Sequence, residues 1–175
     1  MHRRNGKEDN ECPLFLYLTH MITKELIYSI IEKKLAEDEV FAVEVKVSPS
    51  NQIYVEIDSF SGVSINYCVS ISKMIEGALD RDEEDFELEV SSSSASAPFK
   101  VLNHYRKNEG KEVEIFTQDN KKMTGLLQAV TDEGFKLEIE RKEKVEGKKK
   151  KQLIVEQIPF KYEDVRSVRL VIKFK

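Results

Sequence analysis

The chain lacks several features that would point to particular classes of protein. It has no tryptophan, and aromatic residues make up only 9% of its 175 residues, which leaves little material for a surface on which nucleic-acid bases stack. No apolar run approaches the roughly 20 residues that span a bilayer. Its two cysteines, Cys12 and Cys68, lie far apart without a C-x-x-C pair, which argues against a disulfide framework and a zinc site. We therefore expect a reduced, soluble, cytoplasmic protein.

The chemistry of an active site is also missing from the sequence. There is no glycine-rich loop of the kind that cradles phosphates, and no spacing typical of metal ligands. The acidic run from Asp80 to Asp85 is typical of a solvated loop, and His104 has no Cys or Ser partner placed for activation. Cys68 falls on an apolar helical face and is expected to be a core residue. We expect no enzymatic activity, no cofactor and no small-molecule substrate.

Charge is present in plenty, but it is unevenly divided. Residues 1–98 carry 9 Lys and Arg against 19 Asp and Glu, a net charge of −10, whereas residues 99–175 carry 19 against 13, a net charge of +6. The two values give the −4 of the whole chain. A basic half suits phosphate or an acidic surface, and an acidic half suits a basic protein. The two halves are therefore expected to meet different partners.

The first half has the pattern of a small α/β domain. Thr23 and Ser64 are suitable N-caps for two helices, the first ending at about Ala36. Alternating apolar residues predict strands at 41–47, 53–57 and 86–90, with a turn at 48–51. The second helix is expected to bury one stripe of residues: Ile65, Cys68, Ser72, Ile75 and Leu79. The order αββαβ predicts two helices packed on one face of a sheet, a KH-like arrangement without the G-x-x-G loop that clamps nucleic acid.

The second half has the period-two pattern of short, half-buried strands. The alternating runs are Val113 and Ile115; Phe135, Leu137 and Ile139; Leu153 and Val155; and Val168, Leu170, Ile172 and Phe174. Asp119-Asn120 and Asp132-Glu133-Gly134 mark turns, and residues 101–107 form either a short helix or an extended lead-in. Five such strands in an open sheet would leave edges exposed, so we expect them to close into a small barrel.

These patterns predict an α+β protein with four parts. Residues 1–20 form a disordered N-terminal tail and residues 21–93 an αββαβ, KH-like two-layer domain. Residues 94–100 form a linker, because the Ser- and Ala-rich stretch at 93–97 is typical of flexible connections. Residues 101–175 form a small Sm-like (SH3-like) β-barrel.

Two segments carry a resemblance to a known family. V-E-I at 113–115, D-N-K-K at 119–122 and G-F-K-L-E-I at 134–139 resemble an Sm-like barrel. The segments Ile57–Asp80 (I-D-S-F-S-G-V-S-I-N-Y-C) and Ile158–Phe174 (I-P-F-K-Y-E-D-V-R-S-V-R-L-V-I-K-F) resemble, more narrowly, the bacterial RimP family of ribosome maturation factors. The resemblance covers about 22–174. It departs at the junction, where the proline, glycine and arginine usual in the family are Ser93, Ser94 and Ala97.

The resemblance implies a function that the residues alone do not reveal. It implies a non-catalytic assembly factor that binds free small ribosomal subunits during late maturation, with the barrel contacting a small-subunit ribosomal protein. The expected partners are rRNA and a basic ribosomal protein, with no membrane and a monomeric chain. The alternative is an Sm-like RNA-binding protein that acts through its basic barrel.

The charged residues of each half are the candidates for these contacts. The candidate rRNA contacts are the lysines of two hairpin loops: Lys121, Lys122, Lys148, Lys149, Lys150 and Lys151. The alternative is that these loops are solvated hairpin tips whose charge keeps the sheet edges soluble. The candidate contacts with a basic protein are carboxylates on the polar side of the first sheet, which would repel phosphate: Glu44, Glu56, Asp58, Glu87 and Glu89.

Overall fold

The computed structural model describes residues 22–143 and 152–172. The chain divides into two compact units. Unit 1 comprises Met1–Ile57 and Val63–Ser91, and unit 2 comprises Asp58–Gly62 and Ser92–Lys175. Each unit contains its own hydrophobic core.

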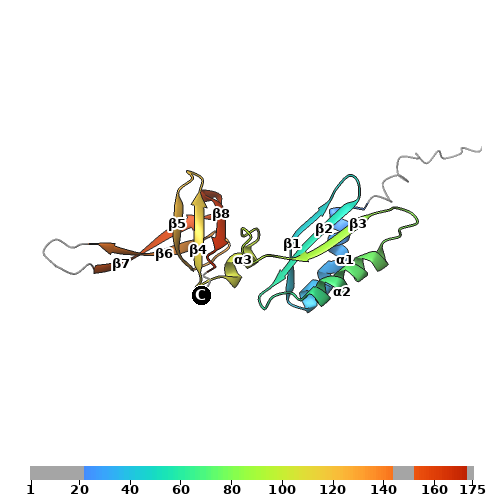
Figure 1. Ribbon diagram of the computed structural model, residues 1–175, viewed down its shortest axis with the longest axis horizontal. Helices are drawn as coiled ribbons and strands as arrows, with labels where there is room; N and C mark the ends of the chain where they lie inside the picture. The colour runs from blue at the N-terminus through green and yellow to red at the C-terminus, as the bar shows by residue number, and fades with distance from the viewer. Residues whose placement is uncertain (1–21, 144–151, 173–175) are drawn as a thin grey trace, which may run out of the picture. The chain divides into compact units, whose positions relative to one another are not determined.

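Unit 1 has the predicted αββαβ order, which confirms the first part of the fold. The elements are α1 (Lys24–Glu37), β1 (Val40–Val47), β2 (Gln52–Ser59), α2 (Ile65–Ala78) and β3 (Glu87–Ser92). The strands form one sheet in the order β1-β2-β3. Both helices lie on the same side of this sheet (Figure 1), so the unit has two layers.

Local sequence signals determine where these elements begin. The hydroxyl of Thr23 accepts a hydrogen bond from the backbone N–H of Leu26 at 3.1 Å, and the Ser64 hydroxyl accepts one from Tyr67 at 3.2 Å. Both side chains therefore cap the first turn of a helix, as predicted. Between β1 and β2 the chain turns at Asn51, which adopts a left-handed conformation with φ of 54°.

The core of unit 1 joins the two helices to the middle strand. Ile31 of α1 and Ile71 of α2 are fully buried, together with Val55 of β2. The predicted stripe on α2 was partly wrong: Ile71 belongs to it, whereas Ile65 is 83% exposed. Cys68, Ile71 and Ile75 follow the helical spacing of three or four residues. Continued toward the start of the helix, this spacing reaches the N-cap Ser64, so Ile65 lies outside the buried stripe. Burial raises the pKa of the Cys68 thiol, as expected of a core cysteine.

Unit 2 carries a short helix and a five-stranded sheet. Its elements are α3 (Leu102–Lys107), β4 (Glu112–Thr117), β5 (Lys122–Gln128), β6 (Gly134–Glu143), β7 (Gln152–Lys161), the 3₁₀ helix η2 (Tyr162–Asp164) and β8 (Val165–Leu170). The strand order is β7-β6-β5-β4-β8 with antiparallel neighbours. The segment 101–107 is thus mostly helical, which decides between the two predicted alternatives.

The register of β6 leaves one hairpin projecting from the sheet. Strand β5 pairs with β6 only through residues 126–128 and 136–138, whereas β6 and β7 pair along their full length, from 134 with 161 to 143 with 152. The outer part of β6 and β7 therefore continues as a two-stranded hairpin beyond β5 (Figure 1). Pro159 lies on β7, an edge strand, where its missing N–H disrupts no ladder.

Alternating residues of these strands form the core of unit 2. Val113, Ile115, Leu137 and Val168 are fully buried, as the period-two pattern predicts, and Leu127 joins them without having been predicted. Val155 and Ile172 of the same pattern are instead 51% and 42% exposed. The α+β class is confirmed, but the expected closure of the barrel was wrong. Within the described part of the chain no pairing joins β7 to β8, and the chain passes from one strand to the other through η2.

Candidate interaction surfaces

Two of the predicted lysines lie where β5 begins. Both Lys121 and Lys122 are exposed, and the turn before them is formed by Asn120, whose φ is 58°. The ammonium group of Lys122 lies 2.7 Å from a carboxylate oxygen of Glu114 on β4. Lys122 is therefore paired within the sheet, whereas Lys121 projects from the tip of the turn. The predicted contacts Lys148, Lys149, Lys150 and Lys151 lie outside the described residues.

The five predicted carboxylates differ in how accessible they are. All occupy positions of β1, β2 and β3 that alternate with core residues, so they belong to one face of the sheet. Glu87 and Glu89 are exposed, and Glu44 is half-buried beside Lys46. In contrast, Glu56 is 5% and Asp58 6% exposed. The accessible acidic patch, as we name it, consists of Glu44, Glu87 and Glu89.

Asp58 takes part in the most buried charge cluster of unit 2. The Nζ atom of Lys107 donates to both carboxylate oxygens of Asp58, at 2.8 and 2.9 Å. The backbone N–H of Ser59 also donates to this carboxylate, at 2.8 Å. Because the Asp58 side chain is only 8% exposed, its charge is compensated inside the protein. It is unavailable to a partner in this arrangement.

His104 belongs to the same cluster and has a structural role. Its Nδ1 accepts a hydrogen bond from the backbone N–H of Lys100 at 3.2 Å, so the proton of the neutral ring is on Nε2. Nε2 lies 3.5 Å from an oxygen of Asp58. The ring is buried, with 4% of the residue exposed. This arrangement positions the start of α3.

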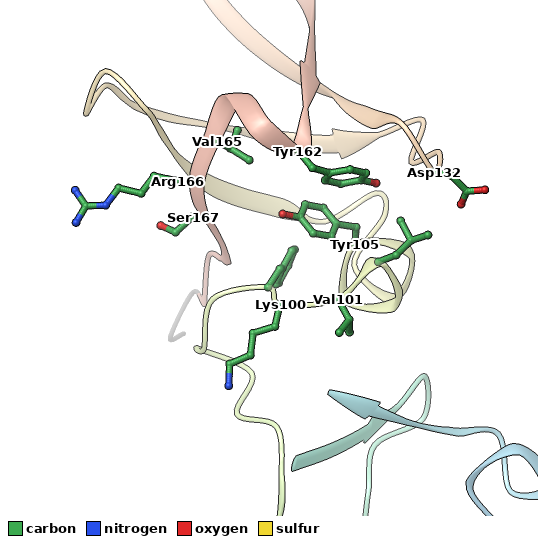
Figure 2. A pocket seen from close by; sticks show the side chains of 10 residues that line it. Lys100, Val101, Tyr105, Asp132, Tyr162, Val165, Arg166 and Ser167 are labelled. Atoms are coloured by element: carbon green, nitrogen blue, oxygen red, sulfur yellow. The ribbon is translucent and has the colours of Figure 1, made fainter. Parts of the chain in front are cut away.

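A pocket between α3 and β8 was not predicted. It has a volume of about 360 Å³, and its lining includes three aromatic and two basic side chains and one serine: Phe99, Tyr105, Tyr162, Lys100, Arg166 and Ser167. Figure 2 shows side chains of this pocket arriving from the segment before α3, from α3 itself, from η2 and from β8. We call this site the aromatic pocket.

The aromatic side chains of this pocket pack edge to face. The Tyr105 ring centroid lies 5.1 Å from that of Phe99 and 4.9 Å from that of Tyr162, with interplanar angles of 77° and 70°. The hydroxyl of Tyr162 donates to the carbonyl of Thr131 at 2.6 Å. Burial, followed by the nearby Tyr162, raises the pKa of Tyr105 to about 12. Tyr105 is therefore a neutral hydrogen-bonding group at physiological pH.

Sequence reasoning missed this pocket because its aromatic residues are scattered along the chain. Phe99 belongs to the predicted linker and Tyr105 to the segment for which two conformations were predicted, and Tyr162 follows them by more than fifty residues. Low aromatic content suggested that no stacking surface could form. The fold nevertheless brings three of the seven aromatic residues of the second half together at one site.

Two other classes of site were sought. In the part of the chain that the structure describes, no three His, Cys, Asp or Glu side chains are grouped as metal ligands. None of the described helices combines the length and apolarity needed to cross a membrane.

Comparison with known proteins shows which family shares this arrangement. Residues 30–94 match the RimP N-terminal domain. The chain is 38% identical over 152 residues to the ribosome maturation factor RimP of Porphyromonas gingivalis, which covers 86% of this chain and 100% of the relative. It is 32% identical over 155 residues to the ribosome maturation factor RimP of Flavobacterium psychrophilum, covering 88% of this chain and 100% of the relative. The protein of the same name from Christiangramia forsetii is 32% identical over 152 residues.

The two-layer αββαβ unit followed by a small five-stranded sheet thus has full-length relatives among ribosome maturation factors. The chain belongs to the RimP family.

Proposed function

We propose that this protein is an assembly factor that binds free small ribosomal subunits in the cytoplasm and supports their maturation without catalysis. The observation that carries the proposal is the similarity, at 38% identity, to the whole length of a protein named as a ribosome maturation factor. The opposite net charges of the two halves also support the proposal. A ribonucleoprotein presents phosphates to a basic half and basic proteins to an acidic half.

In this proposal each half of the chain has its own partner. The lysines at the hairpin tips of unit 2 contact rRNA: Lys121, Lys122, Lys148, Lys149, Lys150 and Lys151. The accessible acidic patch of unit 1 contacts a basic ribosomal protein, because its carboxylates would repel phosphate. The protein acts as a monomer and needs no cofactor.

A second candidate function is a general RNA-binding protein that acts through unit 2 alone. The +6 net charge of residues 99–175 favours it. It differs from the first function in leaving the acidic patch without a partner. Charge reversal of each patch therefore separates the two functions.

The experiment compares two charge-reversed variants with the parent protein. One replaces the six hairpin lysines by glutamate, and the other replaces Glu44, Glu87 and Glu89 by lysine. Each is titrated with isolated small-subunit rRNA and with a mixture of small-subunit ribosomal proteins, at several salt concentrations. A control variant replaces Lys24, Lys33 and Lys73, exposed lysines of unit 1, by glutamate.

The proposal makes opposite predictions for the two patches. The lysine variant loses rRNA affinity, and the slope of log affinity against log salt falls by about 0.7–0.9 for each lost phosphate contact. The acidic-patch variant keeps rRNA binding and loses binding to basic proteins, while the control resembles the parent. Unchanged rRNA binding by the lysine variant would mean that these loops are solvated tips. Unchanged protein binding by the acidic-patch variant would favour the general RNA-binding function.

A further inference from the structure

We propose that the aromatic pocket holds one unpaired base of single-stranded RNA. The inference rests on the proposed function, because it takes contact between unit 2 and RNA as given and names where a base enters. Three observations carry it: the size of the pocket, an accessible tyrosine hydroxyl in its wall and the charge at its mouth.

The pocket has the dimensions and lining of a site for a flat ring. Its volume of about 360 Å³ lies within the range of roughly 300–1,000 Å³ typical of small-molecule sites. Phe99 and Tyr105, packed edge to face, present aromatic surface to it. Bases bind well to such surfaces, because each base has a π-face that stacks irrespective of its identity.

The hydroxyl of Tyr105 identifies the pocket as a polar binding site. The residue is 8% exposed, and its ring is enclosed by Phe99, Phe135 and Tyr162. Figure 2 shows the hydroxyl pointing into the pocket, toward the strand that carries Val165 and Ser167. Among the residues that the structure describes, none forms a hydrogen bond with it, whereas the hydroxyl of Tyr162 bonds to Thr131. The hydroxyl is open to the pocket and bonds to none of the described residues, so it can form a hydrogen bond with a ligand.

The charge around the mouth favours RNA over a basic peptide. Lys100 and Arg166 lie at the rim, and in Figure 2 their charged ends point away from the rings. The carboxylate at the rim belongs to Asp132, and it is already paired with Arg106 at 2.7 Å. A base in the pocket would therefore place its flanking phosphates beside cations. A lysine-rich segment inserting an aromatic side chain would meet repulsion instead.

The test measures RNA binding by the full-length chain and by variants with single atoms or charges removed. The probes are fluorescein-labelled oligouridylate, oligoadenylate and an RNA duplex of equal length, followed by fluorescence anisotropy. Tyr105→Phe removes only the hydroxyl, and Tyr28→Phe is its control, because it removes a hydroxyl from an exposed tyrosine of α1 in unit 1. Arg166→Gln removes a rim charge, and Arg169→Gln removes an exposed charge of β8 outside the pocket lining.

We expect Tyr105→Phe to weaken binding of single-stranded RNA by about fivefold to tenfold, the loss of one ordinary hydrogen bond. Duplex binding stays unchanged, because its bases are not free to enter. Arg166→Gln lowers the affinity and reduces the salt slope by about 0.7. Tyr28→Phe and Arg169→Gln bind single strands as the parent does.

Three results would overturn the inference. If Tyr105→Phe and Arg166→Gln bind single strands as tightly as the parent, RNA binds elsewhere on unit 2 and the proposed function survives without this site. If free uridine or adenosine monophosphate binds as tightly as the oligomers, the ligand is a nucleotide and not RNA. If a lysine-rich peptide with one tryptophan binds in a Tyr105-dependent way and RNA does not, the pocket accepts a protein side chain.

Discussion

The backbone N–H of Phe99 donates a hydrogen bond of 2.8 Å to the carbonyl of Val168. This bond ties the residue that follows the Ser- and Ala-rich stretch to β8, the last strand of unit 2. Phe99 also packs against Tyr105. Phe99 therefore belongs to the packed part of unit 2, and the flexible linker before it stays a prediction.

We predict that mobility in the junction is confined to residues 93–97. Amide relaxation of the full-length protein should give order parameters below about 0.6 in this segment and near 0.85 from Phe99 onward. The physical reason is that serine and alanine offer little apolar surface to pack, whereas Phe99 is hydrogen-bonded, partly buried and packed against an aromatic ring. Uniformly high values from 91 to 99 would contradict the predicted linker.

Two glycine-to-alanine substitutions, one in each unit, test how tightly the chain is packed around each glycine. At Gly125 an added Cβ would collide with the backbone carbonyl of Glu138, and would lie 3.0 Å from a side-chain carbon of Leu137. Gly125→Ala should lower the free energy of unfolding of unit 2 by about 1–3 kcal/mol. At Gly77, within α2, nothing lies within 4 Å, so Gly77→Ala should stabilise unit 1 by about 0.5–1 kcal/mol. Urea denaturation measures both, and equal effects of the two substitutions would refute this account.

The ion pair of Asp58 and Lys107 should contribute to the stability of unit 2. Asp58→Asn leaves a lysine that is only 22% exposed without its charged partner, so we expect a loss of about 1–3 kcal/mol in the free energy of unfolding. Glu163→Gln is the control, because Glu163 and Lys161 are 76% and 72% exposed and their pairing contributes little. Equal effects of the two substitutions in chemical denaturation would show that burial of the Asp58 pair adds nothing.

Tyr105 predicts a loss of stability at alkaline pH. Its pKa is raised to about 12 in the folded protein, against about 10 for an unperturbed tyrosine. Between these values the unfolded chain releases the proton more readily, so the free energy of unfolding falls as pH rises from about 10 to 12. Tyr105→Phe should show a smaller fall over the same interval when thermal unfolding is measured. A parallel pH profile for parent and variant would mean that Tyr105 is not perturbed by burial.

The starts of the helices, the buried face of a strand and a turn could be predicted from local sequence patterns. Thr23 and Ser64 mark helix starts because a hydroxyl at that position satisfies a free backbone N–H of the first turn. The alternation of Val113 and Ile115 with glutamates places one face of β4 in the core. The turn at Asn120 follows from the tolerance of asparagine for positive φ.

The features that were missed depend on residues far apart in the chain. Asp58 alternates with core positions like any surface carboxylate, and only tertiary structure brings Lys107 to it. The aromatic pocket likewise joins Phe99 and Tyr105 to Tyr162 across most of the second half. Closure of the barrel was expected from the need to remove strand edges, but β7 remains an edge in the described sheet.

The central claim is that the protein works on free small ribosomal subunits, and its position in a lysate gradient tests this most directly. The tagged full-length chain and its six-lysine charge-reversed variant are each expressed in cells, and the gradient fractions are probed for the tag and for small-subunit rRNA. The account predicts that the parent co-sediments with free small subunits and is absent from translating ribosomes, while the variant shifts toward the soluble fractions. Parent protein found only at the top of the gradient, or equally on joined ribosomes, would contradict the account.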